Sequence, residues 1–479
     1  MGSSSPPAHT PPLDAAGFIP QKKMILCNAQ QPMQDHDKIS ALPDDILVKI
    51  LSLMSVREAA VTDCLSKRWR HLWANVDHLI LDMHTFGMQV PANSNLSENP
   101  DFWMSEATKF VQNVNELLHR HDDNGVKKIG IQFPLNSAHA SELDRWVAFA
   151  VASHAENLFL YLYNRVTSKV TEPYVFPLKY FADVRDCQLR RLSLQHCILE
   201  PAPPNLSGFS HLDYLLLSYV RAVDEDILNI MSSCHALRYL YLIRCDKLIY
   251  LRISHAQLVA VEVYKCSRVR SISVRTEKLE SFSYMGRQMH IEYECAPVIL
   301  DLSAYFVYGY KFPSVCLGAF PKLEILRLQF PHISRILQHN GIYAGLREIL
   351  LCILTSWKKS IRFVACLLKA APLVKTLQLE VHGNLRPPNE LKIRWPKNFT
   401  PTRLRTIKIG GFSGESELMQ LLLFLLNMSP MLETLRIDTH PWNYVGFKRW
   451  KRRTWKMLRG AIMQERLRGR TWLLKFHLP

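Results

Sequence analysis

Cysteine and histidine are the side chains here with the widest nucleophilic and metal chemistry, so their spacing is the first test for an active site. The 479-residue chain has 11 Cys and 19 His residues, and no two cysteines form a C-x-x-C pair. That pair is the usual spacing of zinc and redox sites. His196–Cys197 and Cys234–His235 are adjacent pairs whose side chains diverge on a strand or turn. We therefore expect neither a metal ligand set nor a catalytic dyad.

Other catalytic signatures are absent from the sequence as well. It has no Gly-rich phosphate loop, no G-x-S-x-G and no paired-histidine zinc motif. The cysteines are too sparse for a disulfide framework, which favours reduced thiols. We expect a chain that binds other molecules rather than an enzyme, with no cofactor.

Three of the cysteines belong to a repeated pattern, apolar-x-x-apolar-x-apolar followed by Asn or Cys. Cys197, Cys245 and Cys266 occupy the Asn/Cys position of its three full copies. Successive copies begin 21 to 30 residues apart, except for one gap of 44 that a degenerate copy at 297–302 divides. Shorter copies begin at Leu212, Leu279, Leu323, Leu346, Val374, Leu404 and Leu432, and weaker ones at Val126 and Ala155.

This period is typical of leucine-rich repeats, which recur every ~20 to 29 residues. Each repeat supplies one short strand, and stacking neighbours buries a continuous core. The pattern therefore predicts an α/β fold with a curved solenoid over residues 126–440. The three cysteines should be buried structural residues, because that position packs against loop backbone.

The segment 37–81 changes to helical periodicity. Pro43 suits a first helical position, and Ser55 with Glu58 is a capping-box signal for a second helix. Ser66 can cap a third. Three short helices cannot bury their own apolar surface, so we expect a partner to cover one face.

This segment resembles an F-box of the plant type. The resemblance rests on Leu42-Pro43, the two aspartates and the apolar helix that follow, and the run LSKRWRHLW ending at Trp73. Ser55-Val56 departs from it, because relatives often carry Pro-Thr there. The alternative is an unrelated three-helix bundle.

The resemblance implies binding to a Skp-type adaptor and, through it, to cullin and RING subunits. The residues that it assigns to adaptor binding are Leu42, Pro43, Ile46, Leu47, Ile50, Leu51, Leu65, Trp69, Leu72 and Trp73. Some of them must belong to the internal core instead, and the sequence does not sort them.

The remaining segments divide into an arm, a linker, the solenoid and a tail. Residues 1–36 read as a disordered arm, and 82–125 as a linker with an amphipathic helix over 102–118. That helix either covers the open end of the solenoid, which we prefer, or binds a partner. The stretches 363–383 and 417–438 resemble the C-terminal repeats of plant F-box proteins with leucine-rich and FBD-like regions, and 384–402 reads as a loop.

Positive charge is concentrated in the tail, residues 441–479. Of the formal net charge of +17, +10 lies there, from eleven Lys or Arg and one Glu. The body is only mildly basic, so composition does not predict a nucleic-acid partner. The cluster KRWKRR at 448–453 is typical of nuclear-localisation or phosphate-binding signals. The alternative is a capping segment with a solvated basic face.

The solenoid should also present one continuous binding surface. The third, fifth and seventh residues of each copy project from the concave side, because strand side chains alternate. Tyrosine and arginine are enriched at binding hot spots. The alternative is a cross-strand aromatic ladder that only stabilises the sheet. The predicted target-binding residues are Arg191, Tyr214, Leu216, Tyr239, Tyr241, Ile243 and Tyr264.

The resemblance implies a substrate-recognition subunit of an SCF-type cullin-RING ubiquitin ligase. A scaffold that targets nothing for ubiquitination, and a binder of nucleic acid or inositol phosphate through the tail, are the alternatives. The longest aliphatic or aromatic run, Leu421–Leu426, is far short of the ~18 residues of a membrane span. With no signal peptide at the N-terminus, we expect a protein of the nucleus or cytoplasm with no membrane partner.

Overall fold

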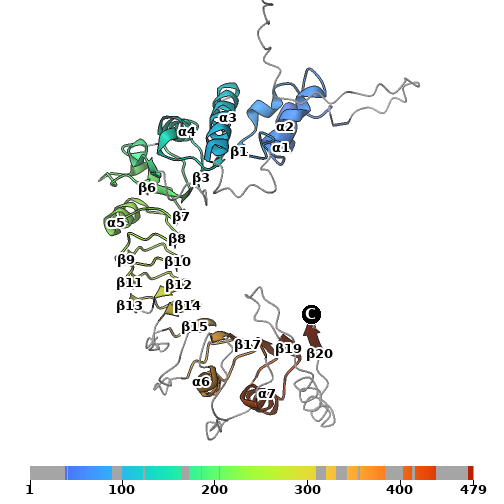
Figure 1. Cartoon of the computed structure of the whole chain (residues 1–479), viewed down its shortest axis with the longest axis vertical. Coiled ribbons are helices and arrows are strands. Elements are labelled where there is room, and N and C mark those ends of the chain that lie inside the picture. The colour runs from blue at the N-terminus through green and yellow to red at the C-terminus, as the bar shows by residue number, and fades with distance from the viewer. Residues whose placement is uncertain are drawn as a thin grey trace, which may run out of the picture.

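The computed structural model describes residues 38–39, 41–88, 100–121, 125–162, 172–184, 186–203, 205–287, 289–308, 320–330, 342–353, 357–382, 403–412, 416–438 and 473–477. The expected arm at 1–36, the loop at 384–402 and the basic cluster at 448–453 lie outside these residues. Figure 1 shows the chain as an arc, with short helices at one end followed by a long row of parallel strands.

The N-terminal unit contains α1 (Asp44–Leu51), α2 (Val56–Val61) and the 3-10 helices η1 (Thr62–Cys64) and η2 (Leu72–Asn75). The predicted capping box starts α2: the Glu58 N–H donates to Ser55 Oγ at 3.3 Å, and the Ser55 N–H donates to Glu58 Oε2 at 2.9 Å. The α-helix expected from Ser66 is replaced by turns leading into η2. A physical reason is that Arg68 turns back to pair with Asp44 at the start of α1.

The solenoid is built on one parallel sheet, which has 15 strands within the described residues, in the order β1-β2-β3-β5-β7-β8-β10-β12-β14-β15-β16-β17-β18-β19-β20. The strands are β1 (His78–Asp82), β2 (Lys128–Gln132), β3 (Asn157–Tyr161), β5 (Arg191–Gln195), β7 (Tyr214–Ser218), β8 (Tyr239–Ile243), β10 (Ala260–Tyr264), β12 (Ser281–Arg287), β14 (Asp301–Tyr308), β15 (Ile325–Phe330), β16 (Glu348–Ile353), β17 (Thr376–Val381), β18 (Thr406–Gly410), β19 (Thr434–Asp438) and β20 (Leu473–His477).

Every predicted repeat leads into one of these strands, which confirms the solenoid. The degenerate repeat at 297–302 leads into β14, and the weak repeats at Val126 and Ala155 lead into β2 and β3. Two strands of this 15-stranded sheet were not expected. β1 directly follows the helical unit and begins the sheet, and β20 pairs with β19 from within the tail.

The outer side of the arc carries the second layer (Figure 1). A parallel three-stranded sheet has the order β13-β11-β9, and a two-stranded one pairs β4 with β6. These strands are β4 (Tyr174–Phe176), β6 (Cys197–Leu199), β9 (Tyr250–Ser254), β11 (Ser271–Arg275) and β13 (His290–Cys295). The helices are α4 (Ala140–Ala152), α5 (Asp224–Ser233), α6 (Trp357–Ala370), α7 (Ser416–Met428), and the 3-10 helices η3 (Ser137–His139), η5 (Leu178–Phe181) and η6 (Ser207–Phe209).

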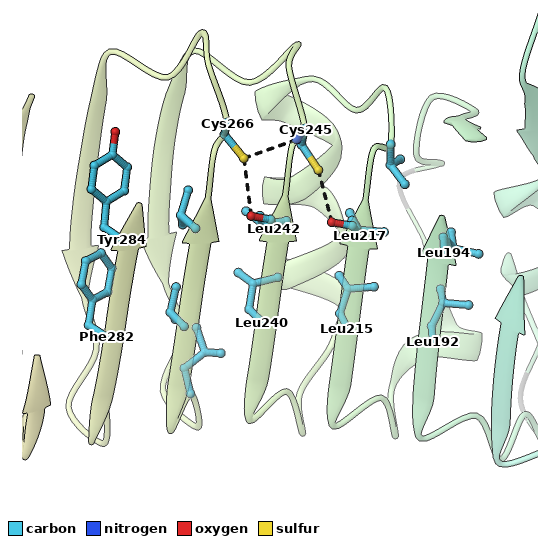
Figure 2. Close-up of a cluster of buried hydrophobic side chains, with 14 of the residues drawn as sticks. Leu192, Leu194, Leu215, Leu217, Leu240, Leu242, Cys245, Cys266, Phe282 and Tyr284 are labelled. Atoms are coloured by element: carbon cyan, nitrogen blue, oxygen red, sulfur yellow. Dashed lines mark hydrogen bonds between the residues drawn. The ribbon is translucent and has the colours of Figure 1, made fainter. Parts of the chain in front are cut away.

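The three repeat cysteines are buried in the core, as predicted, and the thiols of Cys245 and Cys266 connect neighbouring repeats. Cys245 Sγ donates to the Leu217 carbonyl at 3.4 Å, and Cys266 Sγ donates to the Leu242 carbonyl at 3.5 Å. The Cys245 N–H in turn donates to Cys266 Sγ at 3.4 Å. Figure 2 shows this chain of bonds above the rows of inward-pointing leucines. The cysteines therefore satisfy backbone groups where the strands end.

The amphipathic helix is α3 (Pro100–Arg120), and it covers the first strands of the solenoid. The Phe110 ring stacks on Phe133 with centroids 4.2 Å apart, and Trp146 meets Phe110 edge-on. Of its expected apolar stripe, Val111 is half-buried, and the buried members are Trp103, Ala107, Phe110, Val114 and Leu117. This packing favours the covering role over a partner-binding role. Among the described helices, none has the length and hydropathy to cross a bilayer.

Candidate functional site

The structure sorts the ten F-box residues into core and surface. Five of them are buried between α1, α2 and η2, namely Leu47, Leu51, Trp69, Leu72 and Trp73. These side chains hold the small domain together. They are unavailable to a partner unless the domain opens.

The other five lie wholly or partly at the surface. Pro43 and Ile50 (37% exposed) are exposed on α1 and its entry, and Leu65 is 62% exposed beyond η1. Leu42 and Ile46 are half-buried. Positions 43, 46 and 50 share one helical stripe, and positions 47 and 51 share another. α1 therefore turns one stripe to the core and a second one outward.

Four further apolar side chains of this domain are exposed and were not among the predicted site residues. Leu53 is 88% exposed, and Ile39, Met54 and Val61 are also exposed. Leu53 and Met54 follow the end of α1 at Leu51, so neither belongs to a stripe of that helix. We call the exposed set the F-box apolar surface: Ile39, Pro43, Ile50, Leu53, Met54, Val61 and Leu65.

An ion pair connects the start of α1 to the turn segment that precedes η2. Arg68 Nη2 lies 2.6 Å from Asp44 Oδ1, Arg68 Nε lies 2.8 Å from the same oxygen, and Nη2 also donates to the Leu42 carbonyl. The segment carrying Leu65 is thereby held beside the start of α1. The pair therefore helps to place exposed apolar side chains from both segments near one another.

A second candidate surface lies on the concave side of the sheet. Strands β5, β7, β8 and β10 pair in parallel without a register shift, so their outward residues form three rows. The rows are Arg191, Tyr214, Tyr239 and Ala260; Ser193, Leu216, Tyr241 and Glu262; and Gln195, Ser218, Ile243 and Tyr264. The seven predicted target-binding residues all lie in these rows.

Ring contacts hold the centre of this surface. Tyr214 lies 5.2 Å from Tyr241 and 6.3 Å from Tyr239, measured between ring centroids. The Arg191 guanidinium carbon lies 5.8 Å from the Tyr214 centroid, a cation–π distance. Tyr264 is one strand farther, with Lys265 Nζ 5.1 Å from its ring. We call Arg191, Tyr214, Leu216, Tyr239, Tyr241, Ile243 and Tyr264 the concave aromatic surface.

Tyr214 and Tyr241 of this surface, and Glu262 beside them, have pKa values shifted toward the neutral form. Burial raises the pKa of the Glu262 carboxyl. Burial, and then the charge of Glu262, raise the pKa of the Tyr241 phenol, and burial also raises that of Tyr214. The hydroxyls of Tyr214 and Tyr241 therefore stay protonated well above neutral pH and can donate hydrogen bonds to a partner.

The aromatic character continues onto β3 at two residues that the sequence analysis missed. Phe159 and Tyr161 lie with ring centroids 5.5 Å apart, and Lys128 Nζ lies 5.4 Å from the Phe159 centroid. Phe159 packs over Gly130 on β2, where an added Cβ would lie 1.8 Å from the ring. The weak repeat at Ala155 was the available signal, because Phe159 and Tyr161 occupy its fifth and seventh pattern positions.

Comparisons with protein families match both units. A family model described as the At1g61320/AtMIF1 LRR domain matches residues 117–471, and the F-box domain model matches residues 39–81. The first match alone spans most of the chain, and the second covers α1, α2 and η2.

Individual relatives from Arabidopsis thaliana are also named as F-box proteins, two of them with leucine-rich repeats. The chain is 25% identical to the putative F-box/LRR-repeat protein At4g15060 over 70% of this chain and 72% of that one. It is 24% identical to the F-box/FBD/LRR-repeat protein At1g13570 over 85% of this chain and 92% of that one. It is 29% identical to the F-box protein At1g80960 over 55% of this chain and 54% of that one. The chain therefore belongs to the family of plant F-box proteins with C-terminal leucine-rich repeats.

Proposed function

We propose that this protein is the substrate-recognition subunit of an SCF-type cullin-RING E3 ubiquitin ligase. The F-box apolar surface would bind a Skp-type adaptor, which connects the chain to cullin and RING subunits. The concave aromatic surface would hold the target protein. The observation that carries the proposal is the exposure of seven apolar side chains on one small domain.

The F-box apolar surface suits a permanent partner. Water-exposed apolar area costs free energy, and its burial stabilises a complex by roughly 25 cal/mol per Å². Leu53 and Leu65 are large side chains exposed by 88% and 62%. An adaptor that covers them would bind with little dependence on salt, because no charge need be neutralised.

The concave aromatic surface suits a protein target. Half-buried tyrosines with an arginine offer a rigid apolar area together with hydrogen-bond donors, the composition of interface hot spots. In this mechanism the chain performs no covalent step. It raises the effective concentration of target lysines near a ubiquitin-charged enzyme.

The basic tail favours one second candidate function, the binding of a polyanion such as nucleic acid or inositol phosphate. Its net charge of +10 in 39 residues is the supporting observation. Such binding would weaken steeply with added salt, whereas adaptor binding through apolar side chains would not. A scaffold role without ubiquitination differs from both because adaptor binding would persist while no target is modified.

Adaptor binding is tested with charge substitutions on the F-box apolar surface. The full chain is co-expressed with a plant Skp-type adaptor and cullin, and co-purification is compared for Ile50→Asp and Leu53→Asp. The control is Leu228→Asp, on α5 of the solenoid, because Leu228 is exposed by 45%, close to the 37% of Ile50. We expect the two F-box variants to lose the adaptor and the control to keep it. Equal adaptor recovery by all three would refute the proposed surface.

Target recognition needs a second comparison. Proteins captured under proteasome inhibition are compared between the intact chain and one lacking residues 37–75, which keeps β1 in the solenoid sheet. A target should be captured by both chains but should accumulate ubiquitin only with the intact one. A partner that both chains capture without ubiquitination would instead support the scaffold.

A further inference from the structure

Three potential metal ligands meet where β16 and β17 end. Cys352 on β16 lies directly opposite Glu380 on β17, and His382 follows the end of β17. Their ligand atoms, one sulfur, one carboxylate oxygen and one imidazole nitrogen, all lie within 4.8 Å of one another. Cys352 and Glu380 are each 3% exposed, and His382 is half-buried.

Hydrogen bonds outside the cluster place the backbone of His382 and orient the carboxylate of Glu380. The backbone N–H of His382 donates to the Ile353 carbonyl at 2.8 Å, which holds this residue beside the end of β16. Gln378 Nε2 donates to Glu380 Oε1 at 3.2 Å, and the other oxygen, Oε2, lies 3.7 Å from His382 Nε2. Outer partners that orient ligands in this way are typical of metal sites. Gly410 on β18 lies opposite Glu380 and brings no side chain to this position.

We propose that Cys352, Glu380 and His382 form a zinc site that joins β16 to the end of β17. Thiolate and imidazole together select zinc over magnesium or calcium, which prefer oxygen ligands. In a tetrahedral site, zinc lies about 2.3 Å from sulfur and about 2.0 to 2.1 Å from nitrogen and oxygen, so the ligand atoms are roughly 3.3 to 3.6 Å apart. The observed 3.7 Å between Glu380 Oε2 and His382 Nε2 is already close to this spacing. Water takes the fourth position.

The charges of the cluster agree with a divalent cation. A thiolate, a carboxylate and a neutral imidazole sum to −2, which Zn²⁺ cancels. Zinc binding displaces the proton of the Cys352 thiol, which then acts as a thiolate ligand. His382 Nε2 is buried and makes no hydrogen bond with any residue that the structure describes, so its lone pair is available as a ligand.

The competing arrangement is an ion pair between protonated His382 and Glu380, with Cys352 as a neutral neighbour. Both arrangements fit the 3.7 Å distance, but only zinc binding requires the sulfur. Participation of Cys352 is therefore what the test must measure. The site is independent of the adaptor and target surfaces, because it lies in the C-terminal half of the solenoid.

The experiment uses the full chain co-purified with the adaptor. Metal is removed with a chelator, one equivalent of Co²⁺ is added as a spectroscopic probe, and Zn²⁺ is used to displace it. We expect a thiolate-to-cobalt charge-transfer band, intense visible bands of tetrahedral cobalt, and loss of both on addition of Zn²⁺. The melting temperature should rise when Zn²⁺ is restored, because a ligand that binds only the folded state stabilises it.

Substitutions assign the signal to these residues. Cys352→Ala and His382→Gln should abolish the thiolate band and the zinc-dependent rise in melting temperature. Gln378→Ala, which removes only the outer hydrogen bond, should weaken zinc affinity by roughly 10- to 100-fold. Cys187→Ala is the matched control, because Cys187 is equally buried at 3% exposure and lies far along the solenoid from the cluster. It should bind as the unchanged chain does.

Two results would overturn the site. One is an unchanged chain that shows no thiolate–cobalt band and no response of melting temperature to Zn²⁺, which favours the His382–Glu380 ion pair. The other is a band that persists in Cys352→Ala, which places the bound metal at other cysteines. The first result needs no variant, so it decides the question even if Cys352→Ala fails to fold.

Discussion

The rings of Tyr214 and Tyr241 lie 5.2 Å apart at 39° across a diagonal between β7 and β8. Tyr239 also contacts Tyr214, and the Arg191 guanidinium lies over the Tyr214 ring. Because the rings pack against one another, binding need not order them, and a partner pays less conformational entropy than it would for isolated side chains. This preorganisation favours a binding role, although the same contacts also stabilise the sheet.

Replacing Tyr239 and Tyr241 together with Ser separates the two roles. A hot spot predicts a loss of about 2 kcal/mol or more per anchor in target affinity, about 30-fold each. Melting temperature and adaptor binding should hardly change. Affinity capture under proteasome inhibition and differential scanning fluorimetry measure the two effects. The control is Tyr250→Ser, at an exposed position on β9 of the outer layer. A large fall in melting temperature with unchanged capture would make the cluster a structural ladder.

The Glu262 carboxyl gives a prediction about pH. Burial raises its pKa in the folded chain, so the group favours folding when protonated and loses that contribution as pH rises through the folded pKa. At neutral pH the ionised, half-buried carboxylate therefore destabilises the fold. Glu262→Gln should raise the melting temperature at pH 7, and the difference from the unchanged chain should shrink as pH falls through the raised folded pKa of Glu262. A difference that is constant with pH would assign the effect to packing instead.

The strands of the solenoid were predictable because each repeat carries its own apolar pattern and needs only its neighbours to bury it. Cys197, Cys245 and Cys266 were predictable for the same reason. The sorting of Leu47 from Ile46 was not, because both are apolar residues of one helix and packing against η2 decides between them. The pairing of β20 with β19, and the meeting of Cys352 with Glu380, join residues that no local pattern connects.

The Arg68–Asp44 pair predicts a separation of stability from binding. Both side chains are partly exposed, so the pair itself should contribute at most about 1 kcal/mol to stability. Arg68→Ala should therefore lower the melting temperature only slightly. It should weaken adaptor binding more clearly, because the segment with Leu65 is released from α1. Calorimetric titration with the adaptor measures this, with the exposed Arg70→Ala as control. Equal effects of both substitutions would show that the Arg68–Asp44 pair does not position the surface.

The cysteines should differ sharply in reactivity. Cys64 is exposed, whereas burial raises the pKa of the Cys234 thiol to about 12 and also raises that of Cys197. Only the thiolate reacts with a disulfide reagent. In the native chain at pH 8, Cys64 should be labelled rapidly, and Cys197 and Cys234 only after denaturation. Peptide mapping identifies the labelled positions, and Cys64→Ser should remove one fast-reacting thiol. Fast native labelling of Cys197 would contradict its place in the core.

The tail can be tested as a cap and as a charged segment separately. β20 adds a parallel strand to β19 over Leu473–His477, so removal of residues 442–479 exposes the edge of β19. We expect that truncation to lower the melting temperature and the solubility.

Replacing Lys448, Lys451, Arg452 and Arg453 with Gln keeps β20 and removes four positive charges. If the tail is only a cap, this variant should melt as the unchanged chain does and show unaltered nuclear retention. If the tail binds a polyanion, the variant should lose heparin binding with a reduced salt dependence, while its melting temperature stays the same. A fall in melting temperature as large as that of the truncation would show instead that the basic side chains themselves stabilise the end of the solenoid.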